Sequence, residues 1–335
     1  MAVSLASESH SAEPRAVPLT ERLLPHGRLR WVVIAAWSAI PFVRTAIFGL
    51  LVAAAGLISS PMDFFVAHFP GSILNVYALL IVLIGVRPIS QRLAQVAALG
   101  NEQTARVARL NGSTVGPLLL LFVLMVLGET STIVEFGMSA IVGAPLPFVV
   151  EFVFALLIRL PQAVALWTSV IALATVAELG RHPVPGEFPE DRSLGLRKVG
   201  TMLTTVLTLY VAILIPAFIF ATSRVADLVT VVLIAMLGLA AMLVAVWQVH
   251  RRMVAERARE VAVATARYAA AYRKAAIDAG LEAGAELQTA QLMLDGAKSI
   301  HEWPFDDRTE RVAGLLLTSV VAGVIVRLVL IGLGF

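Results

Sequence analysis

Apolar segments about as long as a helix that crosses a lipid bilayer dominate this sequence. A bilayer core of roughly 30 Å requires about 20 mostly apolar helical residues, and lipid admits only helices and closed barrels as spanning structures. Six segments meet or approach that length: 31–59, 72–86, 116–134, 202–222, 228–249 and 312–335. The segment 72–86 is short and either stands alone or begins earlier, around Phe64, with a bend at Pro70 and Gly71. The six segments predict an all-α, polytopic helical membrane protein.

A seventh apolar segment, 148–178, is too long for one perpendicular span and contains Arg159 and Pro161. It forms either one helix that buries Arg159, or a surface helix over 148–160 followed by a span that starts after Pro161. We expect the second arrangement. With this segment, the sequence predicts about seven transmembrane helices.

The composition agrees with membrane insertion. The chain is 59% hydrophobic and 15% charged, whereas soluble domains average about 25% charged residues, which argues against a water-soluble enzyme. The absence of cysteine excludes disulfides, thiolate metal ligands and a cysteine nucleophile. We interpret the strong preference for Arg over Lys, with the many Ala, as codon bias in a bacterial sequence.

Basic residues alternate between successive loops. Cytoplasmic loops collect Lys and Arg because moving them across a membrane is unfavourable. Loops that the span assignment places on one side hold four, four, four and ten of them, in residues 1–30, 87–115, 179–200 and 250–311. The three intervening loops hold only Arg224. We therefore predict a multi-pass protein of the cell (inner or plasma) membrane, with the N-terminus cytoplasmic and the C-terminus outside.

Four regions follow from this topology. Residues 1–30 form a disordered or interfacial cytoplasmic N-terminus, and 31–249 a six-span transmembrane bundle. Residues 250–310 form a cytoplasmic helical hairpin, and 311–335 the final transmembrane helix.

The hairpin is the one large element outside the membrane. Residues 250–279 favour helix, Gly280 and Gly284 suit a turn, and 281–300 return. Apolar and small residues recur at coiled-coil spacing on both arms: Val254, Val261, Tyr268 and Tyr272, then Leu287, Ala290, Leu294 and Ala297. The hairpin either props the spans, or docks a protein partner or a second copy through residues 250–302.

Arg44 is the charge that lies deepest in a predicted span. Arginine at a helix centre costs roughly 2.5–3.5 kcal/mol on insertion scales, and Arg44 lies about 20 Å from the cytoplasmic edge, three residues after Pro41. Glu129 lies at nearly the same depth in the third predicted span. We expect an Arg44–Glu129 ion pair, which either fixes helix register or lines a hydrated conduit.

Four further charges fall in or near the predicted spans. We expect Arg327 to reach the outer surface, and Arg159 to lie at the outer interface if a span starts after Pro161. Glu135 and Glu151 are expected near the outer edge, where each is a solvated charge or part of an acidic vestibule.

Motifs for other chemistry are absent. The sequence has no GxxxxGK[ST], GxGxxG or HExxH, and its six His are scattered. We predict no catalytic, cofactor-binding or metal-ligating residues. The expected partner is the lipid bilayer, and we expect no nucleic-acid partner. The expected function is a non-enzymatic membrane protein whose hairpin docks a partner or self-assembles. The alternative is a transporter or channel with a polar pathway around Arg44 and Glu129, and a membrane-embedded lipid-modifying enzyme ranks last.

Overall fold

The computed structural model describes residues 17–182, 193–220, 225–277 and 280–305 and part of 311–329, and these form helices joined by turns and short irregular segments, without a strand. Within helices, the side chains of residues 127–132, 215–220, 225–231 and 234 are also outside the description. The expectation of an all-α protein is confirmed. The described elements are α1 (Leu19–Leu23), α2 (Arg28–Ser38), α3 (Ile40–Ala54), α4 (Pro61–Ala97), α5 (Glu102–Arg109), η1 (Leu110–Gly112), α6 (Val115–Gly143), α7 (Pro145–Leu179), α8 (Arg197–Phe220), α9 (Val225–Ile277) and α10 (Leu281–Lys298).

Four stretches of described helix are long and apolar enough to cross a membrane. They are Arg28–Ala54, which combines α2 and α3, Pro61–Ala97, Pro145–Leu179 and Arg197–Leu214. A fifth is possible if Glu102–Gly112 and Val115–Val126, which meet at 52°, form one broken span. The predicted count of seven stays a prediction, because much of the expected last span, and the side chains of residues 215–220, 225–231 and 234 in or next to the expected fifth and sixth spans, lie outside the description.

Two expected loops are largely helical. Helix α4 runs without interruption through Pro70 and Pro88, so it exceeds the expected span 72–86 at both ends. Residues 135–147 were expected to form a loop, but α6 continues to Gly143 and α7 starts at Pro145. Within α6, Gly137 has φ 78° and ψ 155° and breaks the helix, a conformation that glycine adopts without the steric cost of a Cβ.

The prediction of a separate surface helix over 148–160 is wrong. Helix α7 runs continuously from Pro145 to Leu179, with Pro161 inside it, so 148–160 and the following span are one element. Proline lacks an N–H and leaves the carbonyl four residues earlier, that of Leu157, without its helical donor. The indole Nε1 of Trp37 donates to this carbonyl over 2.8 Å. A side chain of α2 therefore supplies the hydrogen bond that Pro161 cannot donate, and α7 continues through the proline.

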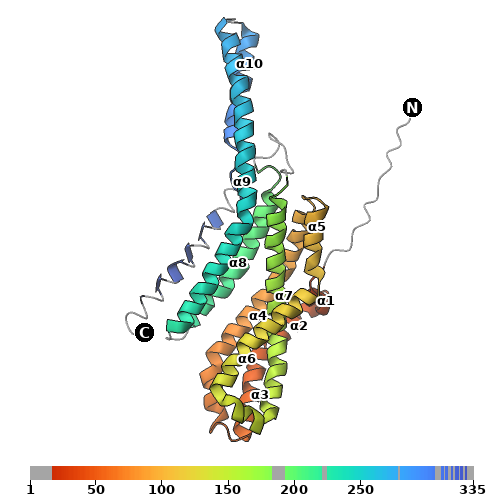
Figure 1. Cartoon of the computed structure of the whole chain (residues 1–335), viewed down its shortest axis with the longest axis vertical. Coiled ribbons are helices and arrows are strands. Elements are labelled where there is room, and N and C mark those ends of the chain that lie inside the picture. The colour runs from red at the N-terminus through yellow and green to blue at the C-terminus, as the bar shows by residue number, and fades with distance from the viewer. Residues whose placement is uncertain are drawn as a thin grey trace, which may run out of the picture.

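The bundle is built around α4 and α7. Helix α4 packs against α2, α3, α7 and α8, and α7 also packs against α6 and α9. The largest described core cluster includes Ile89, Ala108, Val176, Leu203 and Met253 and therefore draws on five helices, α4, α5, α7, α8 and α9. Helices α3 and α6 lie at the end of the bundle away from the hairpin (Figure 1), which we call the far end.

Helices α9 and α10 form an antiparallel hairpin that projects beyond the other helices (Figure 1). The buried residues of α10 include Ala283, Ala290 and Ala297, and those facing them in α9 include Ala264 and Ala271. The predicted stripe on the returning arm is therefore largely confirmed.

The stripe predicted for the outgoing arm of the hairpin is wrong in part. Val254 is 38% exposed and Tyr272 58% exposed, whereas Met253 is fully buried. Small alanine side chains let two helices approach closely, so the alanine face makes the contact and the tyrosines lie at its flank. Tyr268 and Tyr272 stack on each other there, with ring centroids 6.3 Å apart.

The base of the hairpin is attached to the bundle. The imidazole of His250 stacks on Trp303 with ring centroids 3.9 Å apart, and its Nδ1 lies 2.8 Å from the Glu302 carbonyl oxygen. Arg252 donates to the carbonyl of Arg181 over 3.0 Å, beyond the end of α7. These contacts couple the start of the hairpin to the end of a bundle helix.

Candidate functional site

A buried ion pair joins α3 and α7. Nε of Arg44 lies 2.8 Å and 2.9 Å from the two carboxylate oxygens of Glu151, and Nη2 donates to Oε1 of the same group. Glu151 is 1% exposed, whereas the Arg44 side chain retains 30% of its surface. Charges taken out of water need such compensation, and removal of one partner leaves the other uncompensated.

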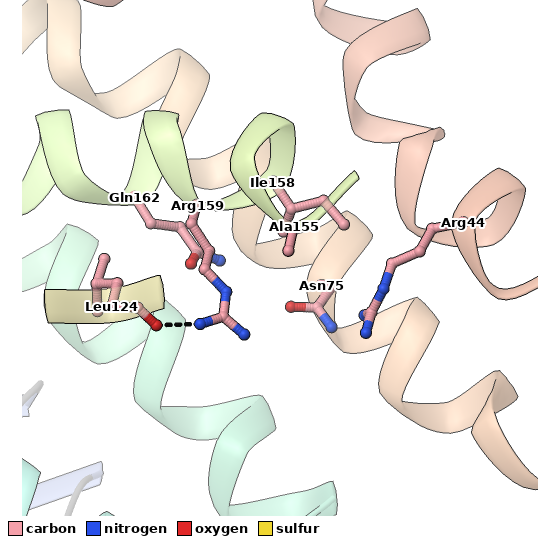
Figure 2. Close-up of a pocket in the computed structure, with 7 residues that line it drawn as sticks. All are labelled: Arg44, Asn75, Leu124, Ala155, Ile158, Arg159 and Gln162. Atoms are coloured by element: carbon pink, nitrogen blue, oxygen red, sulfur yellow. Dashed lines mark hydrogen bonds between the residues drawn. The ribbon is translucent and has the colours of Figure 1, made fainter. Parts of the chain in front are cut away.

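The exposed part of Arg44 lines a cavity of about 310 Å³ between α3, α4, α6 and α7. Its other described lining residues are Asn75, Leu124, Ala155, Ile158, Arg159 and Gln162. Figure 2 shows Arg44 and Arg159 reaching from opposite sides toward Asn75. Two guanidinium groups and two amides therefore face one space, and three aliphatic side chains form the rest of the described lining.

Backbone contacts orient the polar residues of the cavity. Arg159 donates through Nη1 to the carbonyl of Leu124 on α6 (Figure 2). Asn75 donates through Nδ2 to the carbonyl of Gly71, one turn earlier in α4, over 3.0 Å. The Asn75 amide oxygen is thereby left on the side of the cavity.

The cavity lies well inside the bundle. Asn75 follows the first residue of α4 by 14 positions, and Arg159 follows the first residue of α7 by 14. At 1.5 Å per residue, both lie about 21 Å from the far end. This distance is shorter than the thickness of a bilayer core, about 30 Å.

Aromatic rings pack between this cavity and the far end. Phe48 lies one turn beyond Arg44 in α3, and Phe148 lies three residues before Glu151 in α7. The Phe48 ring lies 5.8 Å from Phe64, 5.8 Å from Phe136 and 5.9 Å from Phe148, centroid to centroid. We call these four residues the aromatic cluster. It places packed apolar side chains between the ion pair and the far end.

A second polar contact lies on the far side of the aromatic cluster. The His68 ring stacks on Phe64 with centroids 4.0 Å apart, and its Nε2 lies 3.7 Å from a carboxylate oxygen of Glu135. Glu135 directly precedes Phe136 and lies two residues before the break at Gly137. The break in α6, the aromatic cluster and this pair are therefore adjacent.

The fates of the predicted site residues differ. Arg44 lies at a polar centre as expected, but the carboxylate that it contacts is Glu151. The side chain of Glu129 lies outside the described residues, so the expected Arg44–Glu129 pair stays a prediction. Arg327 also lies outside them. Glu135 is exposed, and its expected place at the outer edge stays a prediction.

Two positions are corrected. Glu151 is a buried partner in an ion pair, not a solvated edge charge, because α7 starts at Pro145 and carries it into the bundle. Arg159 is half-buried and lines the cavity, not an outer interface, because α7 is continuous through Pro161.

Sequence reasoning missed Asn75 and Gln162, the two amides in the lining. A polar amide within an apolar helix is a usable signal, since such residues face an interior or a water-filled space. Among the described residues, no group of three or more His, Cys, Asp or Glu is placed to hold a metal ion.

Comparisons with family models, with curated proteins and with solved structures gave no match for this chain. The functional argument therefore depends on the geometry of the cavity and the hairpin.

Proposed function

We propose that this protein is a membrane transporter or channel that moves a small polar solute by way of the cavity at Arg44. The observation that carries the proposal is a polar cavity of about 310 Å³, about 21 Å from the far end, among helices apolar enough to cross a bilayer. Ionisable residues inside membranes are costly and characteristically face substrate or ion pathways. The exposed edge of Arg44, which lines the cavity at this depth, fits that role better than it fits helix packing alone.

The aromatic cluster supports a gated pathway. It blocks the route from the cavity to the far end, so passage requires these rings to separate. Phe136 is the member best placed to move, because the α6 backbone breaks beside it at Gly137. Short breaks in helices absorb the backbone changes of gating motions. In this proposal, the α6 segment beyond residue 133 opens the cavity to the far side.

The same proposal includes orientation. Lys and Arg gather in every second loop of the predicted topology, as they do in the cytoplasmic loops of membrane proteins. This pattern supports a multi-pass cell-membrane protein with a cytoplasmic N-terminus and hairpin. The far end then faces outward.

Flux into proteoliposomes tests the proposed function. The chain contains no cysteine, so Asn75→Cys introduces one thiol that lines the cavity. Pyruvate, choline and glycerol represent anionic, cationic and neutral solutes. We expect the protein to conduct at least one of them above protein-free liposomes, and reaction of Asn75→Cys with a bulky methanethiosulfonate to reduce that flux about tenfold or more.

Leu281→Cys is the matched control, because Leu281 is 96% exposed on the hairpin and distant from the cavity in sequence and fold. The same reagent should leave the flux of this variant unchanged. No flux of any of the three solutes, or equal flux before and after modification of Asn75→Cys, contradicts the proposed function.

A second candidate function is docking or self-assembly through the hairpin. The observation that favours it is the projection of the hairpin beyond the bundle, with the stacked pair Tyr268 and Tyr272 on its flank. Aromatic residues are enriched in the cores of protein interfaces. Light scattering of the full chain in detergent should give more than one copy per particle, and Tyr272→Glu should reduce this to one. A single copy in both contradicts self-assembly.

A further inference from the structure

We infer that the junction of α1, α2, α4 and η1 binds the phosphate of an anionic phospholipid. This junction carries Arg22 of α1, Arg28 and Arg30 of α2 and Arg87 of α4, and we call these four residues the arginine junction. The lipid phosphate lies at Arg28 and Arg87, and the acyl chains run along an exposed apolar face of α4. Lipid binding at this position goes beyond the proposed function, because it requires no transport.

Arg28 and Arg87 lie at the same height in neighbouring helices. Arg28 is 26 positions from Ala54, the end of α3, and Arg87 is 26 positions from Pro61, the start of α4. Both arginines therefore lie about 39 Å along the helices from the far end. A bilayer core is about 30 Å thick, and with its headgroups it reaches about 40–45 Å. When the far end lies at one membrane surface, both guanidinium groups reach the headgroups of the other.

The packing of α2 on α4 brings these charges together. Ile34 of α2 and Leu83 of α4 belong to one core cluster. Arg30 precedes Ile34 by four residues, and Arg87 follows Leu83 by four, so each lies one turn away on the same helix face. Because α2 leads toward the far end and α4 leads away from it, both turns lie on the side away from the far end. The two arginines therefore extend one helix contact.

Positive charge exceeds negative charge at the arginine junction. Arg30 pairs with Glu21 of α1 through Nη1 and Nη2, each over 2.6 Å. Glu21 is the one acidic residue in the sequence segments that form the junction, 19–38, 83–90 and 110–112. Within the described part of the chain, Arg28 and Arg87 have no hydrogen-bond or ion-pair partner for their guanidinium groups, and both residues are exposed.

The contacts of η1 add the guanidinium of α1 to this charge. Arg22 donates through Nη2 to the carbonyl of Gly112 over 2.7 Å. The neighbouring Asn111 donates to the hydroxyl of Ser90 over 3.0 Å, and Ser90 follows Arg87 by three residues in α4. Backbone carbonyls orient Arg22 but do not cancel its charge, so a third exposed cation lies close to the first two.

An exposed apolar face leads from the arginines toward the interior of a bilayer. Ile84 and Tyr77 of α4 are exposed, and at 3.6 residues per turn they lie within about 80° of Arg87 around the helix axis. Trp31, which follows Arg28 by three residues, is exposed on α2, and tryptophan is enriched at the membrane interface. A phospholipid covers both the arginines and this face, whereas a soluble phosphate covers only the arginines.

Net charge selects the class of phospholipid. Guanidinium groups bind phosphate through charge-assisted hydrogen bonds, and each arginine near a membrane surface favours anionic lipid about fivefold. Phosphatidylcholine carries its own cation beside the phosphate, whereas phosphatidylglycerol does not. Two arginines without a described acidic partner therefore favour phosphatidylglycerol over phosphatidylcholine by about tenfold or more.

Fluorescence quenching of the full chain in bilayers tests this site. The chain contains no cysteine, so Ile84→Cys accepts one bimane label about a turn from Arg87. Brominated lipids quench a fluorophore that they contact. In phosphatidylcholine bilayers, we expect brominated phosphatidylglycerol to compete for this position about tenfold more strongly than brominated phosphatidylcholine. At a label on Leu50→Cys, an exposed position of α3 near the far end, the two brominated lipids should quench alike.

Removal of charge identifies the residues that bind the lipid. Combining Arg28→Gln and Arg87→Gln should reduce the preference at the Ile84→Cys label to about twofold or less. Combining Arg259→Gln and Arg273→Gln removes the same net charge from exposed positions of the hairpin and should preserve the preference. Unchanged gel-filtration behaviour shows that each variant is folded.

The outcomes decide between a lipid site and its alternatives. Equal quenching by both lipids at Ile84→Cys, the same preference at Leu50→Cys, or a preference that survives the loss of Arg28 and Arg87 overturns the inference. Loss of the preference on addition of excess glycerol phosphate assigns the arginines to a soluble phosphate and also overturns it. A lipid preference without flux of any solute supports the lipid site and removes the proposed function.

Discussion

At the scale of single residues, the two partners of the α3–α7 ion pair differ in how much space for water lies beside them. Glu151 is 1% exposed, whereas the Arg44 side chain is 30% exposed and faces the cavity. A charge left without its partner is costly in proportion to its desolvation. The pair should therefore respond asymmetrically to the loss of either member.

We predict that Arg44→Met lowers the free energy of unfolding by about 3–5 kcal/mol, because it leaves the Glu151 carboxylate buried without a cation. Glu151→Gln should cost less, about 1–3 kcal/mol, because Arg44 remains hydrated at the cavity. Unfolding by SDS in mixed micelles, followed by tryptophan fluorescence, measures both values. Equal losses, or a larger loss for Glu151→Gln, contradict the prediction.

The matched control for this experiment is Glu102→Gln. Glu102 forms an i,i+4 pair with Arg106 at 3.8 Å, and both side chains are more than 75% exposed. Exposed pairs contribute about 0–1 kcal/mol, so this variant should unfold almost as the parent does.

Glycines give a second prediction at this scale. A Cβ at Gly200 in α8 would overlap the carbonyl oxygen of Pro304, in the segment that leads away from the hairpin, whereas a Cβ at Gly284 in α10 would meet nothing within 4 Å. Gly200→Ala should therefore destabilise the protein by about 1–3 kcal/mol through overpacking. Gly284→Ala should stabilise it by up to about 1 kcal/mol, as alanine favours helix. Thermal unfolding in detergent compares the two, and similar effects would contradict the structure at Gly200.

At the scale of elements, the continuity of α7 sets the position of the site. The helix passes Pro161 without ending, and Trp37 of α2 donates to the carbonyl of Leu157 that the proline leaves without a helical N–H. This hydrogen bond links the first predicted span to the helix that carries Glu151 and Arg159. The carbonyl that Pro161 leaves without a helical donor is thus part of the contact between α2 and α7.

A double-mutant cycle tests this account. Trp37→Phe should cost about 0.5–1.5 kcal/mol because it removes the hydrogen bond to the Leu157 carbonyl. In a Pro161→Ala background, residue 161 regains an N–H that can reach Leu157, so the same Trp37→Phe change should cost distinctly less. Unfolding free energies of the four proteins give the coupling energy. A cost of Trp37→Phe that is the same in both backgrounds contradicts the proposed role of the indole.

At the scale of the whole molecule, the hairpin and the far end of the bundle lie at opposite ends of one long body (Figure 1). Helix α9, with 53 residues, is about 80 Å long, much more than a bilayer core requires. Part of it must therefore lie outside any membrane that the bundle crosses, and the hairpin contacts show which part.

The predicted topology places the two ends of the chain in different compartments. A reporter fused before Ala2 should report the cytoplasm, and one fused after Phe335 the outside, because seven crossings exchange sides. Leu281→Cys in inverted vesicles should react with an impermeant thiol reagent, and in intact cells it should not. Reporters in one compartment contradict the seven-span topology, and labelling in intact cells contradicts a cytoplasmic hairpin.

The sequence by itself determined the class of this protein. Runs of apolar residues specify helices for a bilayer, since lipid leaves backbone groups no other partner, and the hairpin followed from helix-forming residues on both sides of Gly280. These are local properties, so no knowledge of packing was needed. The depth of Arg44 in its predicted span also pointed to the candidate site.

Only the tertiary structure decided which residues share that site. Arg44 and Glu151 are 107 positions apart, and their contact depends on where α7 begins and on its passage through Pro161. The same helix brings Arg159 and Gln162 to a cavity that Asn75 enters from α4. Depth counted along separate helices cannot show how those helices are rotated against each other, and side-chain contacts depend on that rotation.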